Sequence, residues 1–224
     1  TVLGPDHSRS LPATDVAPNR LEAAQSAAGR LLDQVPKGVR VGAVGFNQRA
    51  RVLQAPTTDR QAVRDALAAL KAEGGTATGE GLYLGRASAK RPTLPGQKPP
   101  PAAIVLLTDG KASNGRDVLQ VAREAKKAGI PVHTVALGTQ SGALPSGGTA
   151  TTDTASLRQI AEISGGKFRT AGDADQLRAV YDELGSRLST KHVRRQVTST
   201  AAGGALLLLV AGAGFSLFSF GRLP

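Results

Sequence analysis

Polar side chains at three separate places in the chain could together hold a metal ion. They lie in the segments 6–10 (Asp-His-Ser-Arg-Ser), 74–79 (Gly-Gly-Thr-Ala-Thr-Gly) and 106–110 (Leu-Leu-Thr-Asp-Gly). Two carboxylates and three hydroxyls from these segments would form a site made only of oxygen ligands. Hard divalent cations such as Mg²⁺ prefer that ligand set, and they often keep positions for water or for an outside carboxylate. The sequence therefore favours metal-dependent binding over catalysis.

The segments between these residues predict an α/β fold. Apolar runs predict strands over 1–3, 39–46, 50–54, 101–107, 130–137 and 167–170. Helical periodicity and capping residues predict helices over 19–35, 58–70, 79–89, 117–128, 155–164 and 174–188. Strands that alternate with helices indicate a doubly wound, mostly parallel sheet with helices on both faces.

The fold places the polar segments at one edge of that sheet. Ligands of such sheets bind beyond the carboxyl ends of the strands. Asp6 and Asp109 each directly follow an apolar run, and the glycine-rich segment 74–79 leads into a predicted helix. We therefore expect the three segments to meet. The glycine-rich segment lacks the Gly-Lys-Ser/Thr ending of a phosphate-binding loop, so we exclude that interpretation.

The composition excludes several other functions. Cysteine is absent and the three histidines are not spaced as a ligand pair, which rules out disulfides and thiolate sites and argues against zinc. The net charge is +11, but the basic residues are mostly scattered and aromatic residues make up only 3% of the chain. Nucleic-acid binding would require a denser basic stripe or stacking aromatics, so we expect no nucleic-acid partner.

The C-terminal segment predicts a membrane anchor. Residues 201–220 contain no charged side chain, and 20 helical residues extend about 30 Å, the thickness of a bilayer core. The alternative is a buried terminal helix, but only Ser216 and Ser219 would give that helix a polar face. The predicted organisation is a domain over 1–190, a basic juxtamembrane linker over 191–200, the span over 201–220 and a tail over 221–224. Methionine is absent, so we expect upstream sequence to be missing and the first strand to be truncated.

The motif Asp-x-Ser-x-Ser, a distant Gly-Gly-Thr, and an apolar strand that ends in Thr-Asp-Gly resemble the von Willebrand factor A domain. The resemblance extends over about residues 1–188, in the same order as in that family. The segment 13–20 (Ala-Thr-Asp-Val-Ala-Pro-Asn-Arg) is similar to bacterial membrane-anchored members, which are often linked to MoxR-type AAA+ ATPases or Bat-type aerotolerance proteins. The resemblance implies a Rossmann-like fold of this family.

The resemblance also implies a metal-ion-dependent adhesion site, with ligand positions at Asp6, Ser8, Ser10, Thr76 and Asp109. The hydroxyls would bind Mg²⁺ (or Mn²⁺ or Ca²⁺) directly, and the two carboxylates would act directly or through bound waters. Thr76 is preferred to Thr78 because it follows the Gly pair. An ion held mainly by hydroxyls keeps net positive charge, so a partner's Asp or Glu can complete its coordination.

Three features depart from the family pattern, one of which is Leu11-Pro12 at a place where methionine is common. Gly4-Pro5 replaces the apolar residues expected before Asp6, and proline there removes a strand hydrogen bond. His7 stands at a position that is usually apolar. An impaired or empty metal site therefore stays open as an alternative.

The sequence thus predicts a membrane-anchored module that binds a divalent cation and a protein partner and has no enzymatic activity. A structural scaffold with a vestigial metal site is one alternative. A metal-dependent hydrolase is another, but it would need a general base that the sequence does not offer beyond the ligands themselves. The resemblance places the domain on the outer face of the cell membrane, whereas Lys191, Arg194 and Arg195 before the span favour the inner face.

Overall fold

The computed structural model describes residues 1–90, 99–109, 114–138, 142–143, 149–150, 153–171, 175–176 and 179. All of them lie in the unit Thr1–Ser189. The main sheet contains β1 (Val2–Pro5), β2 (Val41–Phe46), β3 (Ala50–Thr57), β4 (Ile104–Thr108), β5 (Val132–Leu137) and β8 (Phe168–Ala171). Its strand order is β3-β2-β1-β4-β5-β8, and every neighbouring pair is parallel except β2 and β3.

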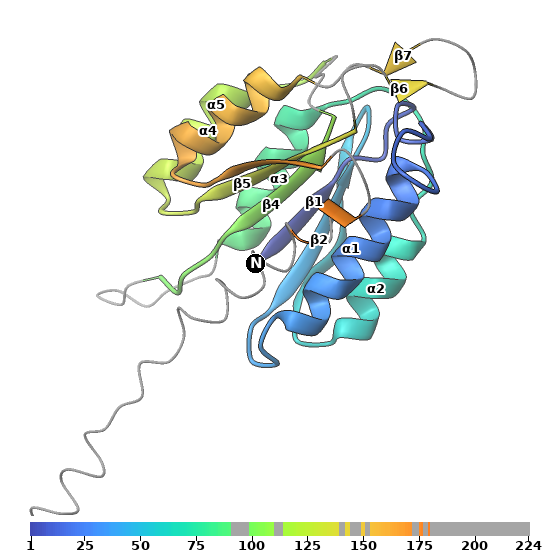
Figure 1. Ribbon diagram of the computed structural model, residues 1–224. Coiled ribbons are helices and arrows are strands. Elements are labelled where there is room, and N and C mark those ends of the chain that lie inside the picture. Colours follow the sequence, from blue (N-terminus) through green and yellow to red (C-terminus); the bar gives the residue numbers. More distant parts are fainter. Residues whose placement is uncertain are drawn as a thin grey trace, which may run out of the picture. The chain divides into compact units, whose positions relative to one another are not determined.

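Helices cover both faces of this sheet (Figure 1). One face carries α1 (Arg20–Gln34) and α2 (Arg60–Ala68), and the other carries α3 (Thr78–Ala89), α4 (Val118–Lys127) and α5 (Thr154–Ser164). A separate antiparallel pair, β6 (Gly142–Ala143) and β7 (Thr149–Ala150), was not predicted from the sequence. The doubly wound, mostly parallel α/β fold is confirmed.

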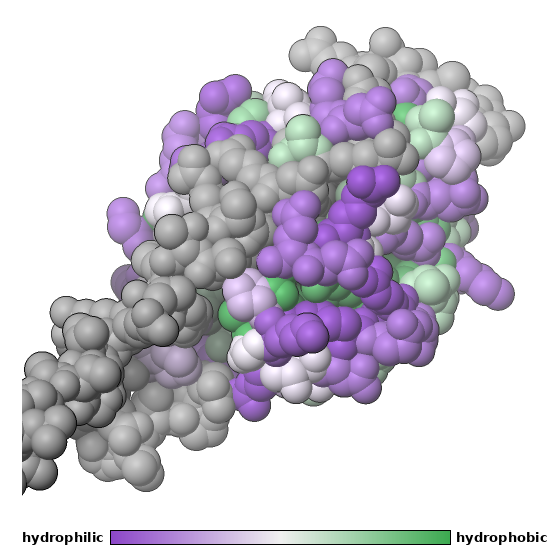
Figure 2. Space-filling model, turned by 60° about the horizontal axis from the view of Figure 1, so that its bottom comes forward, coloured by the Kyte–Doolittle hydropathy of each residue, from purple (hydrophilic) through white to green (hydrophobic). Residues whose placement is uncertain are grey.

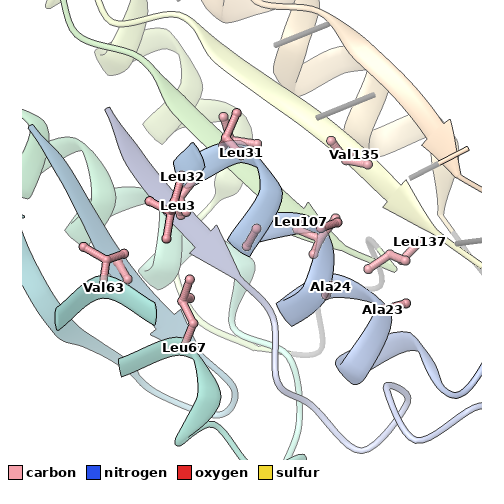
Figure 3. Packing of buried hydrophobic residues seen from close by; sticks show 14 of the residues in the cluster. Leu3, Ala23, Ala24, Leu31, Leu32, Val63, Leu67, Leu107, Val135 and Leu137 are labelled. Carbon is pink, nitrogen blue, oxygen red and sulfur yellow. The ribbon is translucent and has the colours of Figure 1, made fainter. Parts of the chain in front are cut away.

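Alternate residues of the central strands contribute to two hydrophobic cores, one on each face of the sheet. Leu3 and Leu107 face α1 and α2, whereas Val2 and Leu106 face the three helices on the other side. Figure 3 shows the first core, in which Leu31 of α1 lies over the strands. Because both faces are covered, the strands read as continuous apolar runs. Val52, at 44% exposure, is the one large hydrophobic side chain that is exposed among the described residues. Figure 2 accordingly shows a mostly hydrophilic surface on the face that it presents.

Capping residues set the starts of the helices. The side chain of Asn19 accepts a hydrogen bond from the backbone N–H of Glu22 at 2.9 Å, and the Glu22 carboxylate accepts one from the Asn19 amide. Asp59, Asp117 and Asp153 cap α2, α4 and α5 in the same way. Each cap satisfies an N–H group that the helix itself cannot pair.

Pro5 interrupts the sheet on one side without displacing the chain. Toward β4 the pairing is continuous from Val2 to Pro5, and the N–H of Asp6 donates to Leu107 at 2.8 Å. Toward β2 the ladder contains only the pairs of Val2 and Leu3, and it resumes as an isolated bridge between Asp6 and Phe46. Both strands advance by the same number of residues across the gap. The missing proline donor therefore costs one ladder hydrogen bond and leaves the register unchanged.

Some predicted features fall outside the described residues. These are most of the helix over 174–188, the linker over 191–200, the membrane span over 201–220 and the tail over 221–224. Within the part of the chain that the structure describes, no helix is both long and apolar enough to cross a bilayer.

Candidate metal site

The candidate site lies where the chain reverses its direction across the sheet. From β1 the chain moves to β2 on one side, and it later returns to β4 on the other side of β1. The gap between β1 and β4 is therefore the topological switch point, where ligands of open α/β sheets bind. Asp6 directly follows β1 and Asp109 directly follows β4. The structure thus confirms that both carboxylates lie at strand ends.

Backbone hydrogen bonds tie the glycine-rich segment to the first loop. The N–H of Arg9 donates to Gly74 at 3.1 Å, and the carbonyl oxygen of His7 accepts from Glu73 at 2.8 Å. The turn after β2 joins them, since Phe46 accepts from the N–H of His7 at 3.0 Å. Thr76, two residues beyond Gly74, is thereby held on a segment that is bonded directly to the loop 6–10.

Asp6 is completely buried and both of its carboxylate oxygens accept hydrogen bonds. Oδ1 accepts from the backbone N–H of Ser8 at 2.8 Å, and Oδ2 accepts from the Thr108 hydroxyl at 2.5 Å. Burial, reinforced by the negative charge of nearby Asp109, raises the pKa of Asp6 to about 7. The two hydrogen bonds act in the opposite direction but with smaller effect. The carboxylate is thus oriented by the protein yet poorly compensated in charge.

The hydroxyls differ in their surroundings. The Ser8 and Ser10 hydroxyls are 2.9 Å apart and share a hydrogen bond. Thr76 is buried, with 6% exposure. Thr78, in the first turn of α3, is 1% exposed, and its hydroxyl has no hydrogen-bond partner among the described residues. Thr78 is therefore a second threonine hydroxyl that a ligand could use, and the preference for Thr76 stays a prediction.

Asp109 lies beside a buried arginine. Arg20, the first residue of α1, is completely buried and forms a bidentate pair with Asp15 at 2.8 Å for both contacts. Its Nη1 atom also lies 3.7 Å from Oδ2 of Asp109. A Cβ atom on Gly138 would lie 2.3 Å from the guanidinium, so only glycine leaves room for it. Arg20 therefore supplies positive charge directly behind the candidate site.

The surroundings of His7 do not suit it to acid–base chemistry. Its Nδ1 atom lies 3.1 Å from the carbonyl oxygen of Lys71, which can only accept, so Nδ1 carries the proton. Burial is the main cause that lowers the pKa of His7 below its ordinary value of 6.5. Its ring packs against Gly45, where an added Cβ would approach the imidazole to 3.3 Å. The histidine thus serves as a neutral packing and hydrogen-bonding group at a position where the family usually has an apolar residue.

The residues fit a hard cation better than a soft one. No group of three or more His, Cys, Asp or Glu side chains that could hold a metal occurs in the described part of the chain. The donors on the segments that the backbone hydrogen bonds hold together are carboxylate and hydroxyl oxygens, the set that Mg²⁺ accepts together with water. Burial is the main cause of the raised pKa of Asp6, and a divalent cation held by these residues would offset the additional repulsion from Asp109. The donor set and this uncompensated charge both agree with a divalent cation.

Two residues near the site were not singled out from the sequence. Thr108 orients Asp6, and the Thr-Asp-Gly motif already contained it, so its position next to Asp109 was the available signal. Arg20 was noted only as part of the segment 13–20 that carries the family resemblance, and no role was predicted for its charge, because an arginine at the start of a helix is usually solvated. His133 of β5 accepts a hydrogen bond from the backbone of Lys167 at 3.2 Å and is partly buried.

Sequence comparisons identify relatives over the whole chain. The family model for the von Willebrand factor type A domain matches residues 2–183. A UPF0353 protein of Nocardia farcinica is 38% identical over 244 residues, which cover 100% of this chain and 73% of the relative. A UPF0353 protein of Mycolicibacterium vanbaalenii is 36% identical over 232 residues, which cover 98% of this chain and 69% of that relative.

Solved structures show the same fold. BatB from Bacteroides thetaiotaomicron superimposes with a TM-score of 0.72 at 23% identity, covering 84% of this chain and 98% of that one. An aerotolerance-related membrane protein from Bacteroides fragilis gives a TM-score of 0.73 at 22% identity, with the same coverage. At these identities the likeness concerns the fold alone, and the family follows from the sequence match. The chain belongs to the von Willebrand factor type A domain family.

Proposed function

We propose that this domain binds a divalent cation, Mg²⁺ in the first place, and uses it to bind a protein partner. Ser8, Ser10 and Thr76 would contribute hydroxyl oxygens, and Asp6 and Asp109 would act directly or through bound waters. The ion supplies a positive centre on which a carboxylate of the partner can bind. The chain's own residues orient the site and exclude bulk water from its inner side.

The observation that carries the proposal is the pair of buried carboxylates at the switch point. Asp6 and Asp109 are 0% and 3% exposed, and burial together with the negative charge of Asp109 raises the pKa of Asp6. Both oxygens of Asp6 already accept hydrogen bonds from the chain. This geometry supports a role in which Asp6 accepts from a metal-bound water while the hydroxyls contact the ion. Such an ion would keep net positive charge for a partner's Asp or Glu.

Calorimetric titration with Mg²⁺, Mn²⁺ and Ca²⁺ tests the metal site. We expect saturable binding of at least one ion, lost in Asp109→Asn. Asp65→Asn is the matched control, because Asp65 is exposed on α2 and the substitution changes the charge equally. Absence of binding in the unchanged chain, or equal binding in both variants, would refute the metal proposal. Turnover of phosphoesters or peptides in the presence of the ion would point to the hydrolase instead of the binding module.

We also propose that residues 201–220 anchor the domain in the cell membrane, with the domain on the outer face. The absence of charged residues over a bilayer's length supports the anchor. Resistance of the whole chain to alkaline carbonate extraction from membranes tests it, and protease accessibility in intact cells tests the side. A MoxR-type ATPase or another membrane protein of the same family is the partner that the resemblance suggests. Co-purification with Mg²⁺ and its loss in EDTA would support such a partner.

One observation favours the scaffold with a vestigial metal site as the second candidate. Arg20 already places a positive charge 3.7 Å from Asp109, so part of the negative charge is compensated without a metal ion. In that case the chain would show no metal affinity in calorimetry and its thermal stability would not respond to EDTA. The same titration therefore separates the two candidates.

A further inference from the structure

Exposed cations gather on one side of the candidate metal site. They come from the loop 6–10, the turn after β2, the start of β3 and the segment after α2. We name this set the basic rim, and it consists of Arg9, Arg49, Arg51 and Lys71, all exposed. Glu73 is the exposed acidic residue on the same segments. The rim therefore carries a clear excess of positive charge.

Backbone hydrogen bonds connect the segments that carry the rim. The backbone bonds between Arg9 and Gly74, and between His7 and both Phe46 and Glu73, hold the three loops together. His7 lies at their centre. Its ring bonds the carbonyl oxygen of Lys71, and the charge of Arg51 acts on it directly. A segment bound at the metal would thus meet the rim as soon as it extends toward β3.

The rim differs from the opposite side of the site in how its charges are paired. Within the described part of the chain, none of the four rim side chains forms a salt bridge. By contrast, two carboxylates at the starts of α3 and α4 lie close to arginines. Glu80 pairs with Arg116 at 3.2 Å, and Asp117 lies 3.7 Å from Arg123. Among the described residues, Arg116 and Arg123 are therefore paired with carboxylates, whereas the four rim cations are not.

We infer that the partner is an acidic, extended protein segment that binds the metal with one carboxylate and places further carboxylates over the basic rim. This inference rests on the proposed function, and it adds the direction in which the partner segment runs from the metal. The acidic flank lies on one side of the metal-binding residue, the side that runs over the β2–β3 turn. Exposed ion pairs are individually weak, so each rim contact would change affinity by about 1.5- to 5-fold. Their larger effects would be on the association rate and its salt dependence.

Three synthetic peptides of equal length test the direction. Each has a central Asp; one carries three Glu residues before it, one carries them after it, and one has only Ser and Gly in the flanks. Affinities are measured for the whole chain in a non-ionic detergent, with Mg²⁺ and at low salt. We expect one of the two acidic peptides to bind about tenfold more tightly than the neutral peptide, and the other to gain much less.

Charge-reversal variants assign the gain to the rim. Arg49→Glu combined with Arg51→Glu should remove the difference between the two acidic peptides while the affinity for Mg²⁺ alone stays within about twofold. Lys37→Glu combined with Arg40→Glu is the matched control. It makes the same change in charge on the exposed loop before β2, at the opposite end of the sheet. This control should preserve the difference.

Each possible result has a distinct meaning. Equal binding of all three peptides, or an unchanged difference in the rim variant, would overturn the inference and leave metal binding untouched. Rim-dependent binding that is the same in EDTA and in Mg²⁺ would support the rim but refute the proposed metal contact. Rim-dependent binding to vesicles containing phosphatidylserine, with no preference among the peptides, would make the rim a lipid surface and overturn the inference.

Discussion

The affinity of the candidate site for Mg²⁺ should depend on the protonation of Asp6. Burial beside Asp109 raises the pKa of Asp6 to about 7, and a divalent cation requires the ionised form. Protonation weakens binding by a factor of 1 + 10^(pKa − pH), which is about 1.1 at pH 8 and about 11 at pH 6. We therefore expect the dissociation constant to rise about tenfold between pH 8 and pH 6.

Isothermal titration at constant ionic strength measures this dependence. At pH 7 about half a proton should be released for each ion bound, which appears as a difference in heat between two buffers of unlike ionisation enthalpy. A dissociation constant that is unchanged between pH 6 and pH 8, with no proton release, would refute the reasoning.

The metal-free protein gives an independent test of the same pKa. Because the pKa of Asp6 is higher in the folded state than its ordinary value of 3.8, folding favours the protonated carboxyl. Its contribution to stability is complete below about pH 4 and is lost as the pH rises through about 7, with a total loss of up to about 4 kcal/mol. Urea unfolding in EDTA should show this loss, and Mg²⁺ should restore the stability above pH 7. Asp6→Asn should remove this slope, so an equal slope in the variant would assign the titration to another group.

Further substitutions test the ligand threonine, the buried arginine and the close packing of a glycine. Thr76→Val should abolish Mg²⁺ binding in calorimetry, whereas Thr78→Val should keep it. Thr78→Val should leave the free energy of unfolding unchanged or raise it by about 1 kcal/mol, because it removes a buried unsatisfied hydroxyl. Loss of binding in Thr78→Val alone would make Thr78 the ligand. Arg20→Met should lower the free energy of unfolding by about 3–5 kcal/mol in urea titrations, because buried Asp109 and partly buried Asp15 lose their cation. A loss under about 1 kcal/mol would contradict this reasoning. Gly79→Ala would place a Cβ atom 2.1 Å from a backbone oxygen and should lower the free energy of unfolding by at least about 1–3 kcal/mol. Gly38 has open space around it, so Gly38→Ala should change that free energy by no more than about 0.5 kcal/mol. Equal unfolding curves for the two variants would contradict the steric account.

Much of the fold could be predicted because its signals are local. The run 104–107 is apolar throughout, and it forms β4 with both faces covered. Asn19 with Glu22 predicted the start of α1, and that cap is present. The pair β6 and β7 was not predicted, because a two-residue strand is too short to show an alternating pattern of apolar and polar residues. Pro5 was read correctly as a missing donor, but only the paired strands show that the lost bond lies toward β2 and leaves Asp6 in register.

The sequence by itself determined which side chains could bind a cation and that two of them follow strands, because residue type and hydrophobic periodicity are properties of the local chain. Only the tertiary structure decided how those groups are charged and oriented. The pKa of Asp6, the buried Arg20 beside Asp109 and the one-sided rim of cations all depend on residues far apart in sequence. Burial and Coulomb interactions depend on distance in space, and the order of residues along the chain does not contain that distance until the strands are paired.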